Sequence, residues 1–307
     1  MNFTPIIKEV GRGAKGARGL SAATAQEAFT ALLSGEVSDI QLGAWWLAMR
    51  IKGETPEELA AFVEAMQATL AFRVKRTRPI ALLPCYNGAR LLPNLTPLLA
   101  WTLAQRGMDV LLHGVTHDPG RVSTFALFQA LNFPVTDTAE ATHAALTQQR
   151  IAFVPLDALH PKLAALLSNR WRIGVRSTPH TVAKLLQPVD GLAVRIIALT
   201  HGDYIERMGA HISAQPDAEA VVFRGCEGEP VLHPKRAVTV RIFQNGASVM
   251  RDWPGVTAHD LPDTCDIATT VAYIESVIQG RREMPPWIDW LARQVLEASH
   301  EINVPLA

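Results

Sequence analysis

This 307-residue sequence predicts an α/β fold with a small all-helical domain at its N-terminal end. Two observations lead to this fold class. Residues 1–74 carry helical periodicity with short connections, whereas short apolar segments alternate with helical segments after residue 79. Strands separated by helices imply crossover connections and a mostly parallel sheet that is covered on both faces. The chain is also long enough for one large or two medium domains with a sizeable core.

Capping signals define the helices of the first domain. Ser21 and Ser38 each precede an apolar run of helical spacing, as N-cap residues do. Thr55 and Pro56, followed by two glutamates, are typical of another helix start. The first domain therefore covers residues 1–74, and helices from about 158–189 are expected to join it.

The large α/β domain is predicted over residues 79–307. Its expected strands are 80–83, 110–112, 152–154, 195–199, 220–223 and 238–242. A loop is expected over 254–266, and terminal helices over 267–279 and 286–299.

The stretch 81–95 is a candidate phosphate-binding loop. It consists of an apolar strand, a turn at Asn87-Gly88, and a helix whose expected cap is Asn94. Such a turn gathers backbone N–H groups and the positive end of the helix dipole, and Arg90 adds a cation. A pyrophosphate cradle needs several glycines, and Gly88 is the only glycine here. The loop therefore predicts phosphate attraction without a tight pyrophosphate site. The alternative is an ordinary turn with an exposed arginine.

Charge is balanced overall but unevenly distributed. Residues 1–189 hold 19 basic and 13 acidic side chains, a net charge of +6, and residues 190–307 hold 10 and 16, a net charge of −6. Two long runs, 65–108 and 158–189, lack acidic residues. Their cations are Arg73, Lys75, Arg76, Arg78, Arg90 and Arg106 in the first run and Lys162, Arg170, Arg172, Arg176 and Lys184 in the second. The glycine-rich segment 11–19 adds Lys15 and Arg18. These runs favour a phosphate-backbone surface, the alternative being an ordinary solvated face.

Aromatic residues near these cations are candidates for stacking on bases. Trp171, between two arginines, and Tyr86 are the two candidates. Trp45 and Trp46 lie in an apolar helix and are better explained as core or dimer contacts.

The cysteine pattern predicts a reducing compartment. Cys85, Cys226 and Cys265 are far apart, with no metal-ligand spacing, so neither a disulfide framework nor a zinc site is indicated. The sequence shows no signal-peptide pattern and no apolar run of membrane-spanning length. We therefore expect a cytoplasmic protein without a membrane partner.

Several motifs resemble the anthranilate phosphoribosyltransferase family, which is related to the pyrimidine nucleoside phosphorylases. Ser34-Gly-Glu-Val37 and Arg50-Ile-Lys-Gly-Glu-Thr-Pro-Glu-Glu58 occur in the order and at the separation of the family's helical domain. His113-Gly114 and the segment 160–176 resemble further family motifs. The resemblance implies a helical domain that mediates dimers, beside an α/β domain with a ligand cleft between the two.

The departures from this family concern its diphosphate site. Cys85-Tyr-Asn-Gly-Ala-Arg90 stands where the family has Gly-Thr-Gly-Gly-Asp. Glu227 and Glu229 are remnant candidates for the family's acidic pair that holds Mg²⁺, but they are not adjacent. The segment after His113-Gly114 also lacks the family's Asn and Arg. These changes weaken the charge neutralisation that phosphoribosyl transfer needs.

This pattern is similar to the YbiB-like branch, and the resemblance implies nucleic-acid binding without transferase activity. We expect a homodimer that binds DNA, or RNA, independently of sequence through a basic groove. The expected phosphate contacts are Asn87, Gly88, Arg90, Arg170, Arg172, Arg176, Lys184, Lys15, Arg18 and Arg76. No catalytic residue, metal or cofactor is predicted. The alternative is a phosphoribosyl- or glycosyltransferase with an atypical acceptor, which would need Mg²⁺, and a third possibility is an interaction scaffold that uses the acidic C-terminal part.

Overall fold

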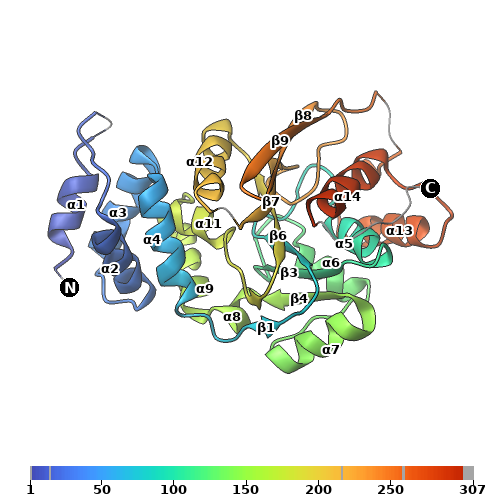
Figure 1. Ribbon diagram of the computed structural model, residues 1–307, viewed down its shortest axis with the longest axis horizontal. Coiled ribbons are helices and arrows are strands. Elements are labelled where there is room, and N and C mark those ends of the chain that lie inside the picture. Colours follow the sequence, from blue (N-terminus) through green and yellow to red (C-terminus); the bar gives the residue numbers. More distant parts are fainter. Residues whose placement is uncertain (1, 14, 216, 258–259, 300–307) are drawn as a thin grey trace. The chain divides into compact units, whose positions relative to one another are not determined.

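The computed structural model describes residues 2–13, 15–215, 217–257 and 260–299. The chain forms two compact units. The helical unit comprises Met1–Ala71 and His160–Pro188, and the α/β unit comprises Phe72–Leu159 and Val189–Ala307. The segment 160–188 therefore returns to the helices of the N-terminal part, as Figure 1 shows for α9 and α11.

The helical unit is built from short helices with well-formed caps. Its helices are α1 (Thr4–Val10), α2 (Ala22–Leu33), α3 (Asp39–Lys52), α4 (Pro56–Gln67), α9 (Pro161–Ser168), α10 (Arg170–Ile173) and α11 (Thr178–Ala183). Ser21 and Ser38 accept backbone hydrogen bonds at the starts of α2 and α3, and Thr55 with Glu58 forms a capping box at α4. The capping residues chosen from the sequence are thus the ones that the structure uses.

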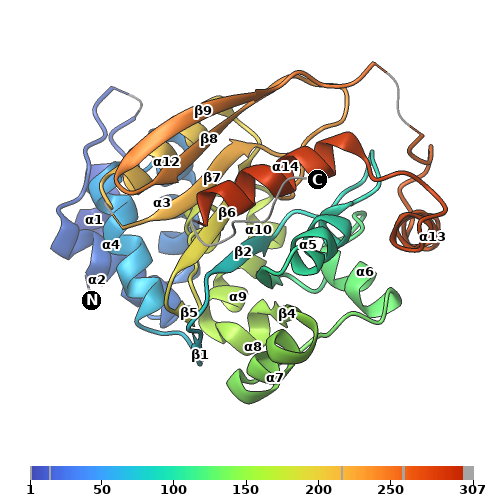
Figure 2. The same cartoon turned by 45° about the vertical axis from the view of Figure 1, so that its right-hand side comes forward.

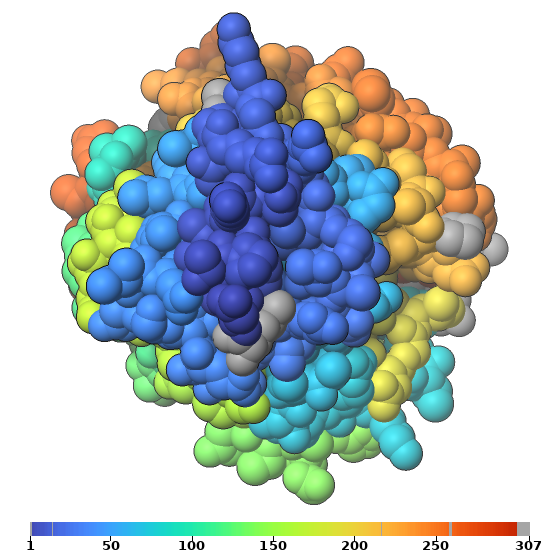
Figure 3. Space-filling model, turned by 90° about the vertical axis from the view of Figure 1, so that its left-hand side faces the viewer, coloured from blue at the N-terminus to red at the C-terminus, as the bar shows by residue number. Residues whose placement is uncertain are grey.

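Aromatic side chains fill the core of the helical unit. Trp45 and Trp46 are fully buried, so they are core residues, as the sequence favoured. The Phe29 and Phe62 rings lie 5.1 Å apart, and Trp45 meets Phe62 edge to face. Figure 3 looks onto this unit, and the blue segment between α1 and α2 stands out from it.

A seven-stranded sheet forms the centre of the α/β unit. The strand order is β4-β3-β2-β6-β7-β8-β9, with parallel pairing from β4 to β7 and antiparallel pairing from β7 to β9. The bounds are β2 (Ile80–Cys85), β3 (Asp109–Gly114), β4 (Ile151–Pro155), β6 (Ala193–Leu199), β7 (Glu219–Arg224), β8 (Val238–Gln244) and β9 (Ala247–Trp253). The predicted fold class, helical domain plus mostly parallel sheet, is confirmed.

Three strands were not expected from the sequence. The strand β9 is exposed at every position except its last residue, Trp253, so it does not present a buried apolar face to the core. Two-residue strands β1 (Val74–Lys75) and β5 (Val189–Asp190) form a separate parallel pair, too short to leave a sequence pattern.

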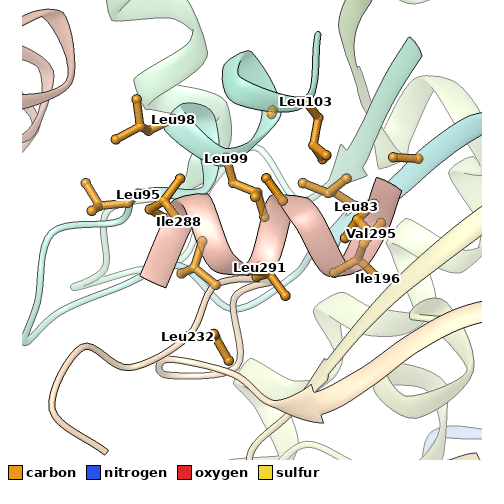
Figure 4. Close-up of a cluster of buried hydrophobic side chains, with 14 of the residues drawn as sticks. Leu83, Leu95, Leu98, Leu99, Leu103, Ile196, Leu232, Ile288, Leu291 and Val295 are labelled. Carbon is orange, nitrogen blue, oxygen red and sulfur yellow. The ribbon is translucent and has the colours of Figure 1, made fainter. Parts of the chain in front are cut away.

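Helices cover both faces of the sheet, and Figure 2 shows α14 and α5 in front of it. The helices of this unit are α5 (Thr96–Gln105), α6 (Thr124–Ala130), α7 (Ala139–Gln149), α8 (Leu156–Leu159), α12 (Gly202–Ser213), α13 (Ile267–Ile278) and α14 (Pro286–Ala298). Leu99 and Leu291 from α5 and α14 meet Leu83 and Ile196 from the sheet in one buried cluster (Figure 4). Across the part of the chain that the structure describes, no helix has the length and apolarity to span a bilayer.

Candidate functional site

The candidate phosphate loop follows β2, at the point where the strand order reverses. The strand β2 pairs with β3 on one side and with β6 on the other, and ligands of open α/β sheets bind at the carboxyl ends of strands at such a point. Gly88 has a φ of +64°, which favours glycine, and a Cβ at this position would lie 3.1 Å from the Val122 carbonyl oxygen. The expected turn at Asn87-Gly88 is present. The helix cap is shifted by one residue, because the N-cap of α5 is Leu95 while Asn94 accepts a hydrogen bond from the Thr96 amide.

Glu229 fills the first half of this loop. The Glu229 carboxylate is buried, and its Oε1 accepts hydrogen bonds from the backbone nitrogens of Asn87 and Gly88, both at 2.8 Å. Its Oε2 accepts the Thr124 hydroxyl at 2.7 Å. Both oxygens of this carboxylate are therefore engaged.

Glu227 fills the second half. Its carboxylate accepts hydrogen bonds from the backbone nitrogens of Arg90, Leu91 and Leu92 at 2.9–3.2 Å. The guanidinium of Arg121 lies 3.6 Å from its Oε2. Five amides of one loop thus surround two carboxylates that come from the same chain.

These contacts correct one expectation about phosphate binding. The amides of Asn87 and Gly88 were expected to donate to phosphate, but they donate to Glu229, and the Asn87 side chain donates to the Glu227 carbonyl oxygen at 2.9 Å. The N–H groups of the loop do converge on negative charge. The anions are two side chains of the protein.

The hydrogen bonds of Glu227 and Glu229 also decide whether these two carboxylates could hold Mg²⁺. A divalent cation that bridges a diphosphate needs carboxylate oxygens that face it together. The oxygens of Glu227 and Glu229 instead face N–H and O–H donors, and the described residues contain no group of three or more His, Cys, Asp or Glu side chains that could hold a metal ion. The two glutamates therefore do not fit a magnesium site.

Tyr86 and Arg76 do not occupy the positions expected of nucleic-acid contacts. Tyr86 is buried, and its hydroxyl lies 2.8 Å from Nδ1 of His113; burial also raises the pKa of its phenol well above the ordinary value. Its ring is therefore not available for stacking on bases. Arg76 forms an ion pair with the buried Asp109, which Arg150 also contacts at 3.1 Å. The Arg76 guanidinium is thus held by a buried carboxylate within the α/β unit.

Three expected phosphate contacts gather in the helical unit. Arg170, Arg176 and Lys184 all act on the buried His180: burial lowers the pKa of this imidazole well below its ordinary value, and the three positive charges lower it further. Trp46 meets the His180 ring edge to face at 5.7 Å. Lys184 is itself buried, so it contributes positive potential more than direct contact.

The exposed part of this segment carries an aromatic ring. The Arg170 guanidinium lies 3.9 Å above the Trp171 ring, which is 52% exposed. Arg172 forms an exposed ion pair with Asp39 at 2.6 Å. Lys15 and Arg18 are exposed in the segment between α1 and α2, and Arg90 is exposed in the α/β unit.

The hydrogen bonds of Glu227 and Glu229 to the loop 87–92, called the two-glutamate lock below, were not predicted from the sequence. A signal for this contact nevertheless exists. Gly225 and Gly228 alternate with the glutamates in Gly225-Cys-Glu-Gly-Glu229. A Cβ on Gly228 would lie 1.7 Å from the Asn87 Nδ2 atom, so this glycine lets the two loops meet. These glycines are the signal that points to a close approach of another backbone segment, but they do not say which segment approaches.

Comparisons with known proteins agree with this fold. A family model described as "Glycosyl transferase family, helical bundle domain" matches residues 4–70. Anthranilate phosphoribosyltransferase from Thermus thermophilus superposes with a TM-score of 0.77 at 22% identity, covering 98% of this chain and 90% of that one. The Saccharomyces cerevisiae enzyme, in complex with PRPP and Mg, gives 0.76 at 14% identity, covering 97% and 92%.

The fold and the loop together define a protein with the anthranilate phosphoribosyltransferase fold, in which the loop after β2 is hydrogen-bonded to two carboxylates of the same chain. The uncharacterized protein YbiB of Escherichia coli is 37% identical over 290 residues, which are 93% of this chain and 90% of YbiB. Anthranilate phosphoribosyltransferase from Desulfitobacterium hafniense is 27% identical over 200 residues, 64% of this chain and 58% of the enzyme. The chain belongs to the YbiB family, which is related to the anthranilate phosphoribosyltransferases.

Proposed function

We propose that this protein binds nucleic acid through its phosphate backbone, independently of sequence, and that it has no phosphoribosyltransferase activity. The observation that supports binding is the cluster of Arg170, Arg176 and Lys184 around His180, beside the exposed ring of Trp171. Cations attract the backbone of any sequence, and an exposed aromatic ring stacks on any base. Arg172, Lys15, Arg18 and Arg90 extend the set of proposed phosphate contacts.

The locked loop supports the absence of transfer chemistry. A diphosphate at this loop would have to displace Glu227 and Glu229 from five amides, and both carboxylates repel it. The competing proposal, a transferase with an atypical acceptor, draws on the names of relatives such as the Desulfitobacterium hafniense enzyme. Calorimetry with phosphoribosyl pyrophosphate and Mg²⁺ separates the two. Micromolar, metal-dependent binding would favour the transferase.

We further propose that the helical unit forms a homodimer through α3. Ile40, Leu47 and Ile51 are 87%, 46% and 68% exposed, and Ala44 between them is also exposed. Their spacing places all four on one face of the helix. A second copy of the chain would cover this apolar face with an equivalent one.

Two variants of one ion pair test the nucleic-acid proposal. Arg172→Gln and Asp39→Asn both break the pair between these residues, but only the first removes a positive charge. In titrations of a labelled oligonucleotide at several salt concentrations, Arg172→Gln should weaken binding about equally for all sequences and lower the salt slope by about 1. Asp39→Asn should retain the wild-type slope. Equal slopes for the two variants would remove Arg172 from the interface, and no binding by the wild type would refute the proposal.

A further inference from the structure

A pocket of about 520 Å³ opens in the α/β unit beside the locked loop. Thr200 directly follows β6 and Arg224 ends β7, so the pocket lies at the carboxyl ends of these two strands. The remaining walls come from 91–92, 225–227, 233, 235–236 and 261–263. Its volume lies in the range of about 300–1,000 Å³ that small-molecule sites occupy. The strand ends are also where open α/β sheets bind ligands.

The pocket carries more positive than negative charge. Arg224, Lys235 and Arg236 line it, all three are exposed, and none forms an ion pair with a carboxylate within the described residues. Two carboxylates, Glu227 and Asp263, are also in its wall. The two carboxylates therefore oppose three cations, and Arg121 also lies 3.6 Å from Glu227, so the lining keeps a net positive charge. The balance favours an anionic ligand.

Part of the pocket lining is apolar. Leu91, Leu92, Leu261 and Pro262 line it, and Leu91 is 69% exposed although it is a large apolar residue. Flat apolar groups bury against such side chains and gain about 25 cal/mol per Å² removed from water. Cations and an apolar wall in one pocket match a ligand that has a phosphate at one end and a planar ring at the other.

We propose that this pocket binds a nucleotide, with its phosphate on Arg224, Lys235 and Arg236 and its base against the apolar wall. The nucleotide is either a free molecule or one unit of a bound strand, since both present the same phosphate and base. This inference goes beyond the proposed backbone binding, because the pocket has its own cations in the α/β unit and is tested with a mononucleotide.

Calorimetry with 2′-deoxyadenosine 5′-monophosphate tests the pocket. Arg236→Gln removes one pocket cation, and Arg251→Gln removes an exposed arginine of β9 outside the pocket as a matched control. We expect the wild type and Arg251→Gln to bind alike and Arg236→Gln to bind at least about fivefold more weakly. Deoxyadenosine, which lacks the phosphate, and ribose 5-phosphate, which lacks the base, should both bind more weakly than the nucleotide.

Each outcome decides the proposal. No binding at millimolar nucleotide, equal binding by Arg236→Gln, or equal binding of deoxyadenosine or ribose 5-phosphate overturns it. When the nucleotide binds as expected, displacement by an oligonucleotide identifies a strand as the source, and lack of displacement identifies a free nucleotide. Failure here is distinct from failure of backbone binding, which is measured with Arg172→Gln and Asp39→Asn on an oligonucleotide.

Discussion

The Oε1 atom of Glu229 lies 2.8 Å from the backbone nitrogen of Gly88, in the turn that the sequence singles out as a candidate phosphate-binding loop. The same oxygen accepts the Asn87 amide, and Glu227 accepts the amides of the next residues. The turn thus keeps its N–H groups directed at negative charge while joining two distant segments of the chain. The N–H groups of this loop therefore serve as a connection within the fold.

The first prediction concerns the strength of this connection. Glu229→Gln puts an amide group against donors that now share a carboxylate, and hydrogen bonds to a charged group contribute about 1.5–3 kcal/mol each. We expect the free energy of unfolding to fall by about 2 kcal/mol or more. Urea denaturation measures it, with Glu275→Gln on an exposed position of α13 as the matched control. Equal stability of the two variants would show that the lock carries little energy.

The second prediction tests the close approach of the two loops. Gly228 and Gly280 have φ values of +88° and +70°, so alanine is strained at both. A Cβ at Gly228 would meet Asn87 Nδ2, whereas nothing lies within 4 Å of one at Gly280. Gly228→Ala should therefore lower the unfolding free energy by more than the roughly 1 kcal/mol expected of Gly280→Ala. Similar losses in denaturation experiments would contradict the contact.

The fold could be predicted from short-range sequence patterns such as helix caps. The site depends on contacts between residues far apart in the sequence, which short-range patterns do not contain. Helix starts could be predicted at Ser21, Ser38 and Thr55, because an N-cap side chain bonds to a backbone amide only three residues further on. Glu229 accepts the amide of Gly88, 141 residues away, and Arg76 forms an ion pair with Asp109, 33 residues away. The spacing of residues along the chain predicts neither of these two contacts. Residue type therefore indicated an anion-attracting loop but could not indicate that the protein supplies the anions.

The third prediction is a loss of stability in acid that depends on His211. Burial, and then the charge of Arg195, lowers the pKa of this imidazole from 6.5 to about 4. Its Nε2 lies 2.8 Å from the Gln215 amide nitrogen, which leaves the ring no acidic partner there. Between pH 6.5 and 4 the unfolded chain binds a proton that the folded chain does not, so stability falls as pH falls, by about 3 kcal/mol from this group.

Chemical denaturation at a series of pH values measures this effect. His211→Asn should flatten the decline below pH 6.5, whatever its stability at neutral pH. The matched control, His143→Asn at an exposed histidine of α7, should keep the wild-type decline. Parallel curves for all three proteins would assign the acid sensitivity to other groups.

The fourth prediction concerns the homodimer. Leu47→Glu places a charge in the middle of the exposed apolar face of α3, and burying it against a second copy would be costly. The variant should sediment as a monomer at concentrations where the wild type is a dimer. Glu64→Gln, on an exposed position of α4, serves as the control and should leave the dimer intact. A monomeric wild type, or a dimeric Leu47→Glu, would place any interface elsewhere.

The last prediction separates stacking from charge at Trp171. The exposed ring lies under the Arg170 guanidinium, so it can present an aromatic surface to an unpaired base while the arginine meets a phosphate. Base stacking contributes about 1–3 kcal/mol per base, so Trp171→Ala should weaken binding of a single-stranded oligonucleotide at least about fivefold. Trp171→Phe retains a ring and should recover most of that affinity. A duplex keeps its bases paired, and its affinity should change little in either variant, because Arg170 remains to contact phosphate. Equal losses for single strand and duplex in Trp171→Ala would mean that the ring positions Arg170 and does not stack.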